Sequence, residues 1–437
     1  MSSRTDPLLL PAVVLSCQGA PEADLNLVRA LGEQGVPVIV VAEEAQPPSR
    51  HSRYCVAFHH LPDFTRDPAR LLVLLRGLQA EHQALLPVFP SADPDLAALL
   101  ALELPLATVC RSVTALPDVA RLLMDKRAFG VVAEQLGLPV PRTFSPRTME
   151  AAAALSHTVD YPVIVKPTHP VAWKHPGLDP AVARAKALLV DDPAELMRLC
   201  GLLAPHGLEV LVQEYIPGLD EEHYSVHVYV DPEGCAQASY TARKWRTFPI
   251  HAGSGCHVES VHWPALESEA VEILQTLGFR GIANMNFKRH ARTGRAMLIE
   301  INPRTSQTSI LAARAGVNLA WLAYRATCAL PRLPAAPRRF GLRYLNAGLD
   351  FHAFRAYRRV GEWGWGGYLS TVLRPGLVYQ YASLRDPKPL WHLVRSLLVR
   401  RFGAPAAASV PRSGTMPDGS HQAGPVADLP SIIDRPG

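Results

Sequence analysis

The sequence predicts an α/β fold at the N-terminus, followed by an α+β fold in the centre of the chain. Strand and helix patterns alternate with short connections over the first 110 residues, which is typical of a parallel sheet covered on both faces. From about residue 115 to residue 330, alternating strands and a hairpin turn indicate a module built on antiparallel strands. The chain has 437 residues, too many for one ordinary core, so we expect two or three domains.

The N-terminal region, residues 1–112, predicts a doubly wound parallel sheet. Its apolar runs read as buried strands, and its amphipathic runs read as helices, the first of which closes at Gly35. The strands are expected in PAVVLSC, VPVIVVAE and ALLPVF, and the helices in ADLNLVRALGEQG, DPARLLVLLRGLQAEH and DPDLAALLALE. The first turn, CQGAPEAD, lacks a GxGxxG pattern, so dinucleotide binding has little support.

The central region, residues 113–331, begins with a predicted helix pair in DVARLLMDKRAFGVVAEQLG. Strands are then expected in YPVIVKPT, LEVLVQEYIPG, YSVHVYVD, GIANMNFKRH and AMLIEIN, with ARTGR as the hairpin turn between the last two. Helices are expected in PAELMRLCGLL, SEAVEILQTLG, SILAARAG and LAWLAYRATCAL.

Residues 332–403 are strongly basic. Up to residue 402, thirteen Arg and Lys residues stand against Asp350, Glu362 and Asp386, and Trp363, Trp365 and Trp391 lie among them. Such a region could shape a substrate pocket, or could dock onto an acidic partner or a membrane surface through its Arg and Trp side chains. Residues 404–437 are rich in Pro, Ala, Ser and Gly, so we expect a disordered tail.

The composition excludes several classes of protein. Hydrophobic residues make up 48% of the chain and charged residues 19%, and the formal net charge of +5 is modest, so we expect a globular protein that does not bind nucleic acid. No apolar run reaches the roughly 18 residues of a membrane span. The seven cysteines are scattered without CxxC or metal spacing, which favours a reducing, cytoplasmic environment. The N-terminal apolar run reads as a first strand. The sequence has no GxxxxGK[ST] pattern, which excludes the P-loop class of nucleotide-binding proteins.

The most informative stretch is LIEINPRTS, residues 298–306. Residues i and i+2 of a strand point to the same side, so Glu300 and Asn302 should project together while Ile299 and Ile301 face a core. A carboxylate and a carboxamide are oxygen ligands suited to Mg²⁺. Pro303 ends the strand, and Arg304 then presents a planar fork that matches a carboxylate or a phosphate. The alternative interpretation is the polar face of an exposed hairpin.

Three further positions precede this stretch in a fixed order. Lys126 follows Asp125 near a predicted helix start, Lys166 ends an apolar strand, and Glu214 stands where a strand leaves for a turn. Each has an ordinary explanation as a solvated surface residue. Lysine is a rare choice in this chain, however, because only seven of the 44 basic residues are lysine, and the ordered series gives these positions more weight.

The ordered series MDKRAF, YPVIVKP, VQEYIPG, GIANMNFKR and TGRAMLIEINPR, followed by SLRDPKPL, resembles the ATP-grasp superfamily. Within it the chain is most similar to carboxylate–amine ligases of the D-aspartate ligase type, over residues from about 10 to about 390. The resemblance implies an ATP-grasp fold with a Rossmann-like pre-ATP-grasp domain at residues 1–112. An ATP-grasp domain follows at 113–331, with a small lid subdomain at about 140–215 and a larger one at about 216–331, and then a C-terminal extension.

The resemblance also implies roles for individual residues. Lys126 and Lys166 match the lysines that contact the ATP phosphates, and Lys166 and Arg304 are the expected catalytic cations. Glu214, Tyr215 and Ile216 match the hinge that reads the adenine. An acid shortly after the hinge holds the ribose, for which Glu221 is the choice and Asp220 and Glu222 are rivals. Glu300 and Asn302 match the ligands of Mg²⁺, for which Mn²⁺ could substitute. Arg304 lies beside the γ-phosphate and the acceptor carboxylate.

One position departs from the family pattern. The strand before the hairpin usually supplies an acid in a pattern like EFK, whereas this chain has NFK with Asn286. An asparagine can still donate an oxygen to a metal, but one negative charge is lost. The change could weaken one metal position or indicate an altered activity.

The stretch ARKWRTFPIHAGSGCHVES, between the hinge and the metal strands, is basic and contains small residues. We expect either a solvated loop or a lid, in which Arg243 and Lys244 bind the substrate carboxylate or a phosphate together with Arg304.

The function that follows from the resemblance is an ADP-forming ligase, which activates a carboxylate as an acyl phosphate and couples it to an amine. The substrates would be a small-molecule or peptide carboxylate and an amine, and the chain could form a homodimer. The alternatives are an ATP-binding protein without ligase activity, suggested by Asn286, and a carboxylase or carbamoyl-phosphate-type reaction.

Overall fold

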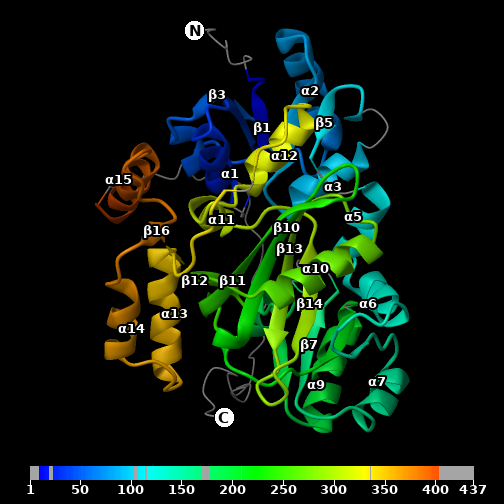
Figure 1. The fold of residues 1–437 in the computed structure, drawn as a ribbon. Coiled ribbons are helices and arrows are strands. Elements are labelled where there is room, and N and C mark those ends of the chain that lie inside the picture. The colour runs from blue at the N-terminus through cyan, green and yellow to red at the C-terminus, as the bar shows by residue number, and fades with distance from the viewer. Residues whose placement is uncertain are drawn as a thin grey trace, which may run out of the picture.

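The computed structural model describes residues 9–18, 23–102, 106–113, 116–168, 173, 175, 177–207, 209–334 and 336–402, and these residues form three β-sheets (Figure 1). The tail expected from residue 404 lies outside the described residues. The mixed α/β fold predicted from the sequence is confirmed.

The N-terminal sheet is parallel and has the strand order β3-β2-β1-β4-β5. Its strands are β1 (Ala12–Ser16), β2 (Val38–Ala42), β3 (Cys55–His60), β4 (Leu86–Pro90) and β5 (Cys110–Ser112). The expected strands in PAVVLSC, VPVIVVAE and ALLPVF are present, whereas β3 and β5 were missed. CVAFHH has no clear alternation of apolar and polar residues, and β5 has only three residues.

Helices cover both faces of this sheet. They are α1 (Ala23–Gly32), η1 (Pro48–His51), α2 (Pro68–His82) and α3 (Asp93–Ala101). Along β1, Val14 packs in the core shared with α1, and Val13 packs in the core shared with α2 and α3. Because successive side chains of a strand alternate between faces, a continuous apolar run such as AVVLS is what a strand buried on both faces requires.

The central sheet has seven strands in the order β14-β13-β10-β11-β12-β15-β16. These are β10 (His223–Val230), β11 (Ala236–Phe248), β12 (Ser254–Val261), β13 (Gly281–Arg289), β14 (Ala296–Asn302), β15 (Arg343–Leu345) and β16 (Leu377–Tyr379). One face carries alternate apolar side chains, including Val226, Met285 and Leu298, and packs on neighbouring helices. Those helices are α5 (Pro117–Met124), α6 (Lys126–Gln135) and α10 (Pro264–Thr276).

A smaller sheet has the order β6-β9-β7-β8. Its strands are β6 (Thr143–Phe144), β7 (Val163–Pro167), β8 (Leu188–Val190) and β9 (Val210–Glu214), and its helical elements are α7 (Met149–Ser156), α8 (Pro180–Arg184), α9 (Pro193–Leu203) and η2 (Ala204–His206). All three of its strand pairings are antiparallel. The sheet holds Lys166 of β7 and Glu214 at the end of β9.

The stretch ARKWRTFPIHAGSGCHVES was expected to form a loop or a lid, and this expectation was wrong, because most of it lies in the strands β11 and β12. Residues 236–248 form the longest strand of the central sheet, β11, which pairs with β10 on one side and with β12 on the other. The basic residues Arg243, Lys244 and Arg246 therefore hold fixed positions on a sheet. The sequence suggested a loop because charged and aromatic residues interrupt the apolar pattern along the strand.

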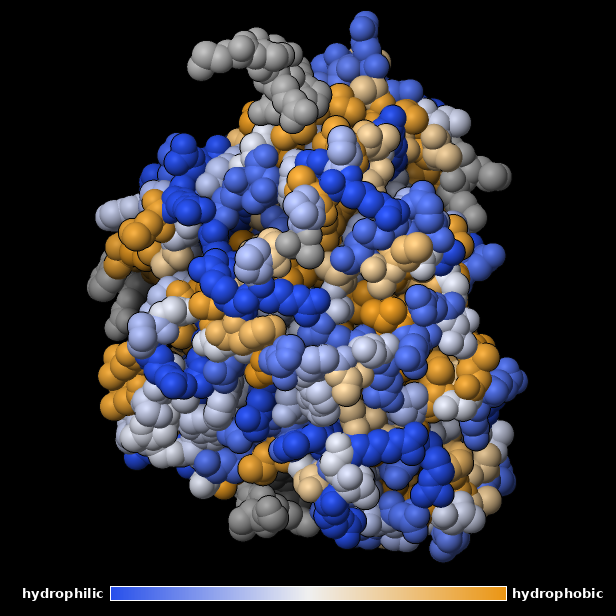
Figure 2. Space-filling model, viewed as in Figure 1, coloured by the Kyte–Doolittle hydropathy of each residue, from blue (hydrophilic) through white to orange (hydrophobic). Residues whose placement is uncertain are grey.

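The basic region after residue 332 is hydrogen-bonded to the central sheet, because its β15 pairs with β12 and with β16. The region also forms the helices α13 (Ala347–Arg359), α14 (Trp365–Val372) and α15 (Lys388–Phe402). The helices that precede it, α11 (Ser309–Arg314) and α12 (Leu319–Thr327), pack between α1 and the sheet. In Figure 1, α14 and α15 lie along the left edge of the molecule, and Figure 2 shows hydrophobic surface gathered at that edge. The domain boundaries themselves stay a prediction.

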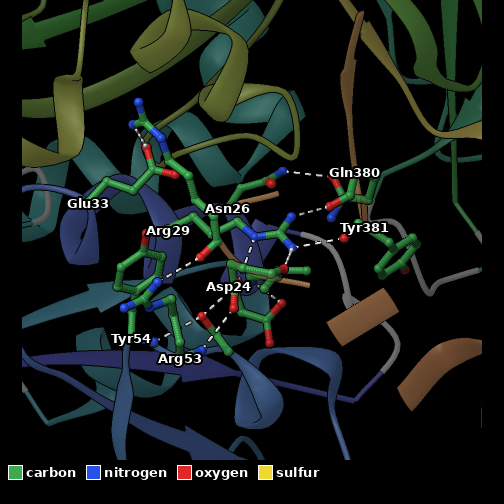
Figure 3. Close-up of polar contacts among 12 residues, drawn as sticks. Asp24, Asn26, Arg29, Glu33, Arg53, Tyr54, Gln380 and Tyr381 are labelled. Carbon is green, nitrogen blue, oxygen red and sulfur yellow. Dashed lines mark hydrogen bonds and ion pairs between the residues drawn. The ribbon is translucent and has the colours of Figure 1, made fainter. Parts of the chain in front are cut away.

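Two buried arginines hold this region in place. Arg246 of β11 donates to both oxygens of Asp350 on α13, at 2.7 and 2.9 Å. Arg29 of α1 donates to the Asp386 carboxylate at 3.0 Å and to the carbonyls of Gln380 and Tyr381 (Figure 3). The side chains of Arg29 and Asp386 are 2% and 0% exposed, so Asp386 of the segment SLRDPKPL forms a buried tie to the N-terminal region.

Candidate active site

A cavity of about 530 Å³ lies between β14, the small sheet and the ends of α3 and α6. Its lining includes four of the residues singled out in the sequence, which are Lys126, Lys166, Glu300 and Asn302. It also includes Asp93 of α3 and Gln213 of β9, which the sequence did not indicate. The cavity thus combines the lysines with the proposed metal ligands, although these residues lie up to 176 positions apart in the chain (Lys126 to Asn302).

Glu300 and Asn302 project to the same side, as predicted. The Asn302 amide nitrogen lies 3.3 Å from Glu300 Oε1, and the Asn286 amide donates to the same oxygen at 3.0 Å. The expectation that Ile299 faces the core was wrong, because the register with β13 shifts at this point and Glu300 and Leu298 pair with consecutive residues. Leu298 takes the core position, and Ile299 lines the cavity.

Surrounding lysines keep the Glu300 carboxyl group ionised. Burial raises the pKa of this carboxyl, but Lys126, Lys166 and Lys244 outweigh that effect and lower the pKa to about 2. Glu300 is therefore ionised at any physiological pH. Three cations around one carboxylate leave a net positive field, which suits an anionic ligand.

Lys166 is buried, with 9% of its surface exposed, and its Nζ donates to Gln213 Oε1 at 3.0 Å. Gln213 in turn donates to Thr143 Oγ1 at 2.8 Å, which fixes the orientation of the amide. Burial and the charge of Lys126 lower the pKa of Lys166 to about 8, while Glu300 opposes the shift. Lys166 therefore begins to lose its proton at a pH only slightly above neutral. Gln213 could have been found from the sequence as the neighbour of Glu214 on β9.

Lys126 is the first residue of α6. The Asp125 side chain caps this helix by accepting hydrogen bonds from the backbone nitrogens of Arg127 and Ala128, at 2.9 and 3.1 Å. The cap places Lys126 at the positive end of the helix, facing the cavity. In the sequence pair Asp-Lys, Asp125 therefore caps the helix and Lys126 places a positive charge at the cavity.

The residues around Glu300 fit a hard divalent cation. Asn284 and Asn286 of β13 lie opposite Asn302 and Glu300 of β14, so four polar side chains share one face of the hairpin. The buried Asn284 Oδ1 has no hydrogen-bond partner, which leaves an oxygen lone pair available to a ligand. The donor set would be the Glu300 carboxylate and amide oxygens. The Asn286 and Asn302 amides turn their nitrogens toward Glu300, so both would have to rotate to present their oxygens to a cation. Among the described residues no group of three or more His, Cys, Asp or Glu side chains could hold a metal.

Asn284 was missed in the sequence, although the same i, i+2 rule that joins Glu300 to Asn302 would have found it two residues before Asn286. Asn286 itself accepts a hydrogen bond from Ser225 Oγ at 2.9 Å. Its amide is thus held on both sides, by Ser225 and by Glu300.

Arg304 follows β14 and is joined to the N-terminal region. Its Nε and Nη2 donate to the two carboxylate oxygens of Asp93, at 2.6 and 2.9 Å. Burial lowers the pKa of Arg304, but Asp93 more than compensates and raises it. The fork of Arg304 is therefore occupied by the Asp93 carboxylate in a bidentate pair.

The three hinge residues are at the end of β9 and beyond it, and none is among the described residues that line the cavity. Glu214 accepts a hydrogen bond from the Arg142 backbone nitrogen at 3.2 Å. The Tyr215 ring lies 4.8 Å from Lys288 Nζ, and Ile216 is buried at 4% exposure. Lys288 is itself buried at 9% exposure, so a cation and an aromatic ring meet at the hinge.

Of the three acids after the hinge, two already bind other residues of the protein. Asp220 is buried and accepts hydrogen bonds from Thr247, Tyr357 and the His251 backbone. Glu222 forms a bidentate pair with Arg289. The Glu221 carboxylate lies 3.9 Å from Arg243 Nη2, a looser contact. Glu221 therefore stays the best candidate for binding a ribose.

Arg243 and Lys244 lie on opposite faces of β11, because successive residues of a strand alternate. Lys244 lies on the face of Glu300, whose carboxylate counteracts the lowering of the Lys244 pKa that burial causes. Arg243 Nε instead donates to the Glu221 carbonyl at 2.7 Å. The structure thus brings Lys244 to the candidate site and places Arg243 against the post-hinge segment.

Two histidines on β10 were also missed. His223 and His227 lie on the same face as Ser225, opposite Lys288 and Asn284 of β13, and the Nε2 atom of each is buried without a partner. Burial and Lys244 lower their pKa values, to about 3 and about 4, with Lys288 contributing at His223. Both rings are neutral, and their unpaired nitrogens add hydrogen-bonding capacity beside the lysines.

Comparison with known proteins finds similarity to ATP-grasp proteins. A family model described as "ATP-grasp in the biosynthetic pathway with Ter operon" matches residues 208–347. The chain is 28% identical over 200 residues to the N-terminal section of the carbamoyl phosphate synthase large chain of Methanopyrus kandleri, which covers 44% of this chain and 33% of the relative. It is 25% identical over 293 residues to D-aspartate ligase of Enterococcus faecium, covering 64% of this chain and 68% of the relative.

Solved structures share the fold. One is the biotin carboxylase domain of 2-oxoglutarate carboxylase from Hydrogenobacter thermophilus in complex with MgADP, with a TM-score of 0.57 and 16% identity over 76% of this chain and 73% of that chain. Another is the ADP complex of an N5-carboxyaminoimidazole ribonucleotide synthetase, with a TM-score of 0.58 and 15% identity over 81% and 86%. These matches confirm the resemblance to the ATP-grasp superfamily. The matched part spans at most a third of the length of the carbamoyl phosphate synthase large chains to which this chain is similar.

Proposed function

We propose that this ATP-grasp chain is an ATP-dependent ligase that activates a carboxylate as an acyl phosphate and couples it to an amine. The observation that carries the proposal is the convergence of Lys126, Lys166 and Lys244 on Glu300, at a cavity large enough for part of a nucleotide. A cationic pocket around one carboxylate suits a triphosphate and its divalent cation.

The triphosphate would contact Lys126 at the start of α6 and Lys166 on β7, so that both cations neutralise charge that develops during phosphoryl transfer. Glu300, Asn302 and Asn286 would hold Mg²⁺, with Asn284 as a further oxygen donor. Held by these residues, a divalent cation would supply positive charge that stabilises the triphosphate. Mn²⁺ could substitute because the donors are all oxygens.

The nucleotide base would lie toward the hinge, where Glu214, Tyr215 and Ile216 end β9. Ile216 offers an apolar surface, and Glu221 offers a carboxylate for the ribose hydroxyls. This placement rests on the order of the residues along β9 and on the position of Lys166 one strand away.

The chemistry would proceed in two displacements. An oxygen of the substrate carboxylate attacks the γ-phosphorus of ATP, ADP leaves, and an acyl phosphate forms. The amine then attacks the acyl carbon, phosphate leaves, and the amine loses a proton as the amide bond forms. Arg304 would position the carboxylate by exchanging Asp93, which its fork binds in this structure, for the substrate.

The relative D-aspartate ligase supports the ligase reaction, since it is matched over about two thirds of both chains. The test is ADP release measured across a panel of carboxylates, each paired with a panel of amines. A pair that yields ADP and an amide in equal amounts is the expected result. Glu300→Gln should abolish turnover, while Glu134→Gln, at an exposed position on α6, serves as the matched control.

A carbamoyl-phosphate-type reaction is the second candidate, because the chain is also similar to carbamoyl phosphate synthases. There the activated carboxylate would be bicarbonate. Bicarbonate-dependent ADP release without any organic acid would favour this candidate. ATP binding without ADP release from any pair would instead favour a nucleotide-binding protein.

A further inference from the structure

The last described helix, α15, has one face that packs on the protein and another that does not. Its packing face includes the buried Pro389 and the half-buried His392, whose ring stacks on His51 of η1 at a centroid distance of 3.7 Å. On other sides of the helix, large apolar side chains are exposed. They are Trp391 at 72%, Val394 at 40%, Leu397 at 55%, Leu398 at 52% and Val399 at 60%.

The spacing places most of these side chains on one stripe. Trp391, Val394 and Leu398 follow one another at intervals of three and four residues, and Leu397 lies three residues after Val394, so the four share one face of the helix. Within the described part of the chain, nothing covers this stripe enough to bring any of these residues below 40% exposure. An apolar stripe of this extent on a surface marks an interaction site.

The charge on α15 has a single sign. No acidic residue lies between Pro387 and Phe402, whereas Lys388 and Arg395 are exposed, and Arg400 and Arg401 occupy the last turn. The nearest acid, Asp386, is buried against Arg29 and cannot offset these charges. The helix therefore presents an apolar stripe together with uncompensated positive charge.

The same edge of the molecule carries a second exposed apolar group. Trp365, Leu369 and Leu373 of α14 and its C-cap are 47%, 43% and 76% exposed. In Figures 1 and 2, the hydrophobic surface at the left edge coincides with α14 and α15. Both helices belong to the region that Arg29 and Arg246 hold firmly in place, so the edge is a fixed surface.

We propose that α15 binds peripherally to an anionic lipid surface, with Trp391 and Leu398 in the headgroup boundary and Lys388 and Arg395 against lipid phosphates. A helix whose exposed apolar stripe is flanked by basic residues, as Lys388 and Arg395 flank Trp391 and Leu398, is suited to lie in the plane of an interface. No helix among the described residues is long and apolar enough to cross a bilayer, so the contact is peripheral. Charge favours this occupant over a second copy of the chain, because two such faces would bring like charges together.

The test uses the full chain and sedimentation with vesicles of phosphatidylcholine alone or with a third phosphatidylglycerol. The expected result is binding to the anionic vesicles that weakens as salt is raised, with a blue shift in tryptophan emission that Trp391→Phe reduces. Leu398→Asp should lower the bound fraction at least tenfold. Arg395→Gln should weaken binding about fivefold, the effect of one basic charge near a membrane surface.

Val73→Asp is the matched control, because Val73 is 68% exposed on α2, away from α15. It should bind vesicles as the unchanged chain does. ATP binding by every variant shows that it is folded, and the lipid readout does not depend on the ligase activity. Equal binding to neutral vesicles, no binding at low salt, or loss of a dimer in solution on Leu398→Asp without any lipid binding would each overturn the proposal.

Discussion

Arg304 and Asp93 form a bidentate ion pair across 211 residues of sequence, with nitrogen–oxygen distances of 2.6 and 2.9 Å. Asp93 begins α3 of the N-terminal sheet, and Arg304 follows the strand that carries Glu300 and Asn302. The pair therefore connects the N-terminal region to the candidate site. A substrate carboxylate that binds Arg304 would compete with Asp93.

The first prediction concerns this pair. Arg304→Ala should lower kcat/KM for ADP release at least tenfold, because the planar fork is lost, and the loss should appear mainly in the KM for the carboxylate if Arg304 only binds it. The measurement is steady-state ADP release with the carboxylate varied. Arg314→Ala, which breaks a similar pair with Glu33 between α11 and α1, should leave KM unchanged. An unchanged KM for Arg304→Ala would remove this role.

The second prediction concerns Asn286. Asn286→Asp would place a second carboxylate beside Glu300, so without metal the like charges should lower Tm, and Mg²⁺ should restore it. The Mg²⁺ concentration needed for half-maximal ATP binding should fall severalfold. Asn346→Asp is the control, since Asn346 caps α13 and an Asp caps equally well. A Tm that does not respond to Mg²⁺ in the Asn286 variant would contradict the metal assignment.

The third prediction is a pH dependence of ATP binding. Burial lowers the pKa of Lys166 to about 8, so its charge is lost as pH rises through that value, and contact with phosphate favours the charged form. ATP affinity should fall above pH 8, by up to about tenfold per pH unit, the limit for uptake of one proton. Lys166→Arg keeps its charge and should flatten the profile. Calorimetric titration between pH 6.5 and about 9.5 would measure it, and an equal slope in the two proteins would contradict the assignment.

The fourth prediction concerns acid stability. The folded pKa of Glu300, about 2, lies below its ordinary value of 4.5, so its stabilising contribution is complete above 4.5 and is lost as pH falls toward 2. Glu300→Gln cannot lose this contribution. The variant should therefore show a smaller decrease in unfolding free energy between pH 4.5 and pH 2 than the unchanged protein, as measured by urea denaturation at each pH. Parallel curves would show that other carboxylates dominate.

The fifth prediction concerns the tie between the C-terminal region and the N-terminal sheet. Asp386→Ala leaves the buried Arg29 unpaired and should lower the unfolding free energy by about 3–5 kcal/mol. Asp118→Ala, in an exposed pair with Arg121, should cost no more than about 1 kcal/mol. Chemical denaturation of both variants tests the difference. A similar cost for both would mean that Arg29 finds other partners, such as the carbonyls of Gln380 and Tyr381.

The sequence by itself determined the local features of this protein. Apolar runs predicted β1, β2 and β4 of the N-terminal sheet, because a strand buried on both faces has no polar positions. The spacing of Glu300 and Asn302 placed them on one side of β14, because that relation depends only on the pleat of a strand. The bulge at Ile299 was not visible, because it arises from the register with β13.

The tertiary structure decided what depends on distant partners. Lys244 appeared to lie in a loop until its strand was seen between β10 and β12, since pairing on both sides outweighs a weak local preference. Asp93 and Asp386 carried no local signal, yet each is paired with an arginine more than 200 residues away. The low pKa of Glu300 likewise arises only because the fold brings lysines to it, against the effect of burial. The low pKa values of His223 and His227 arise from burial together with nearby lysines.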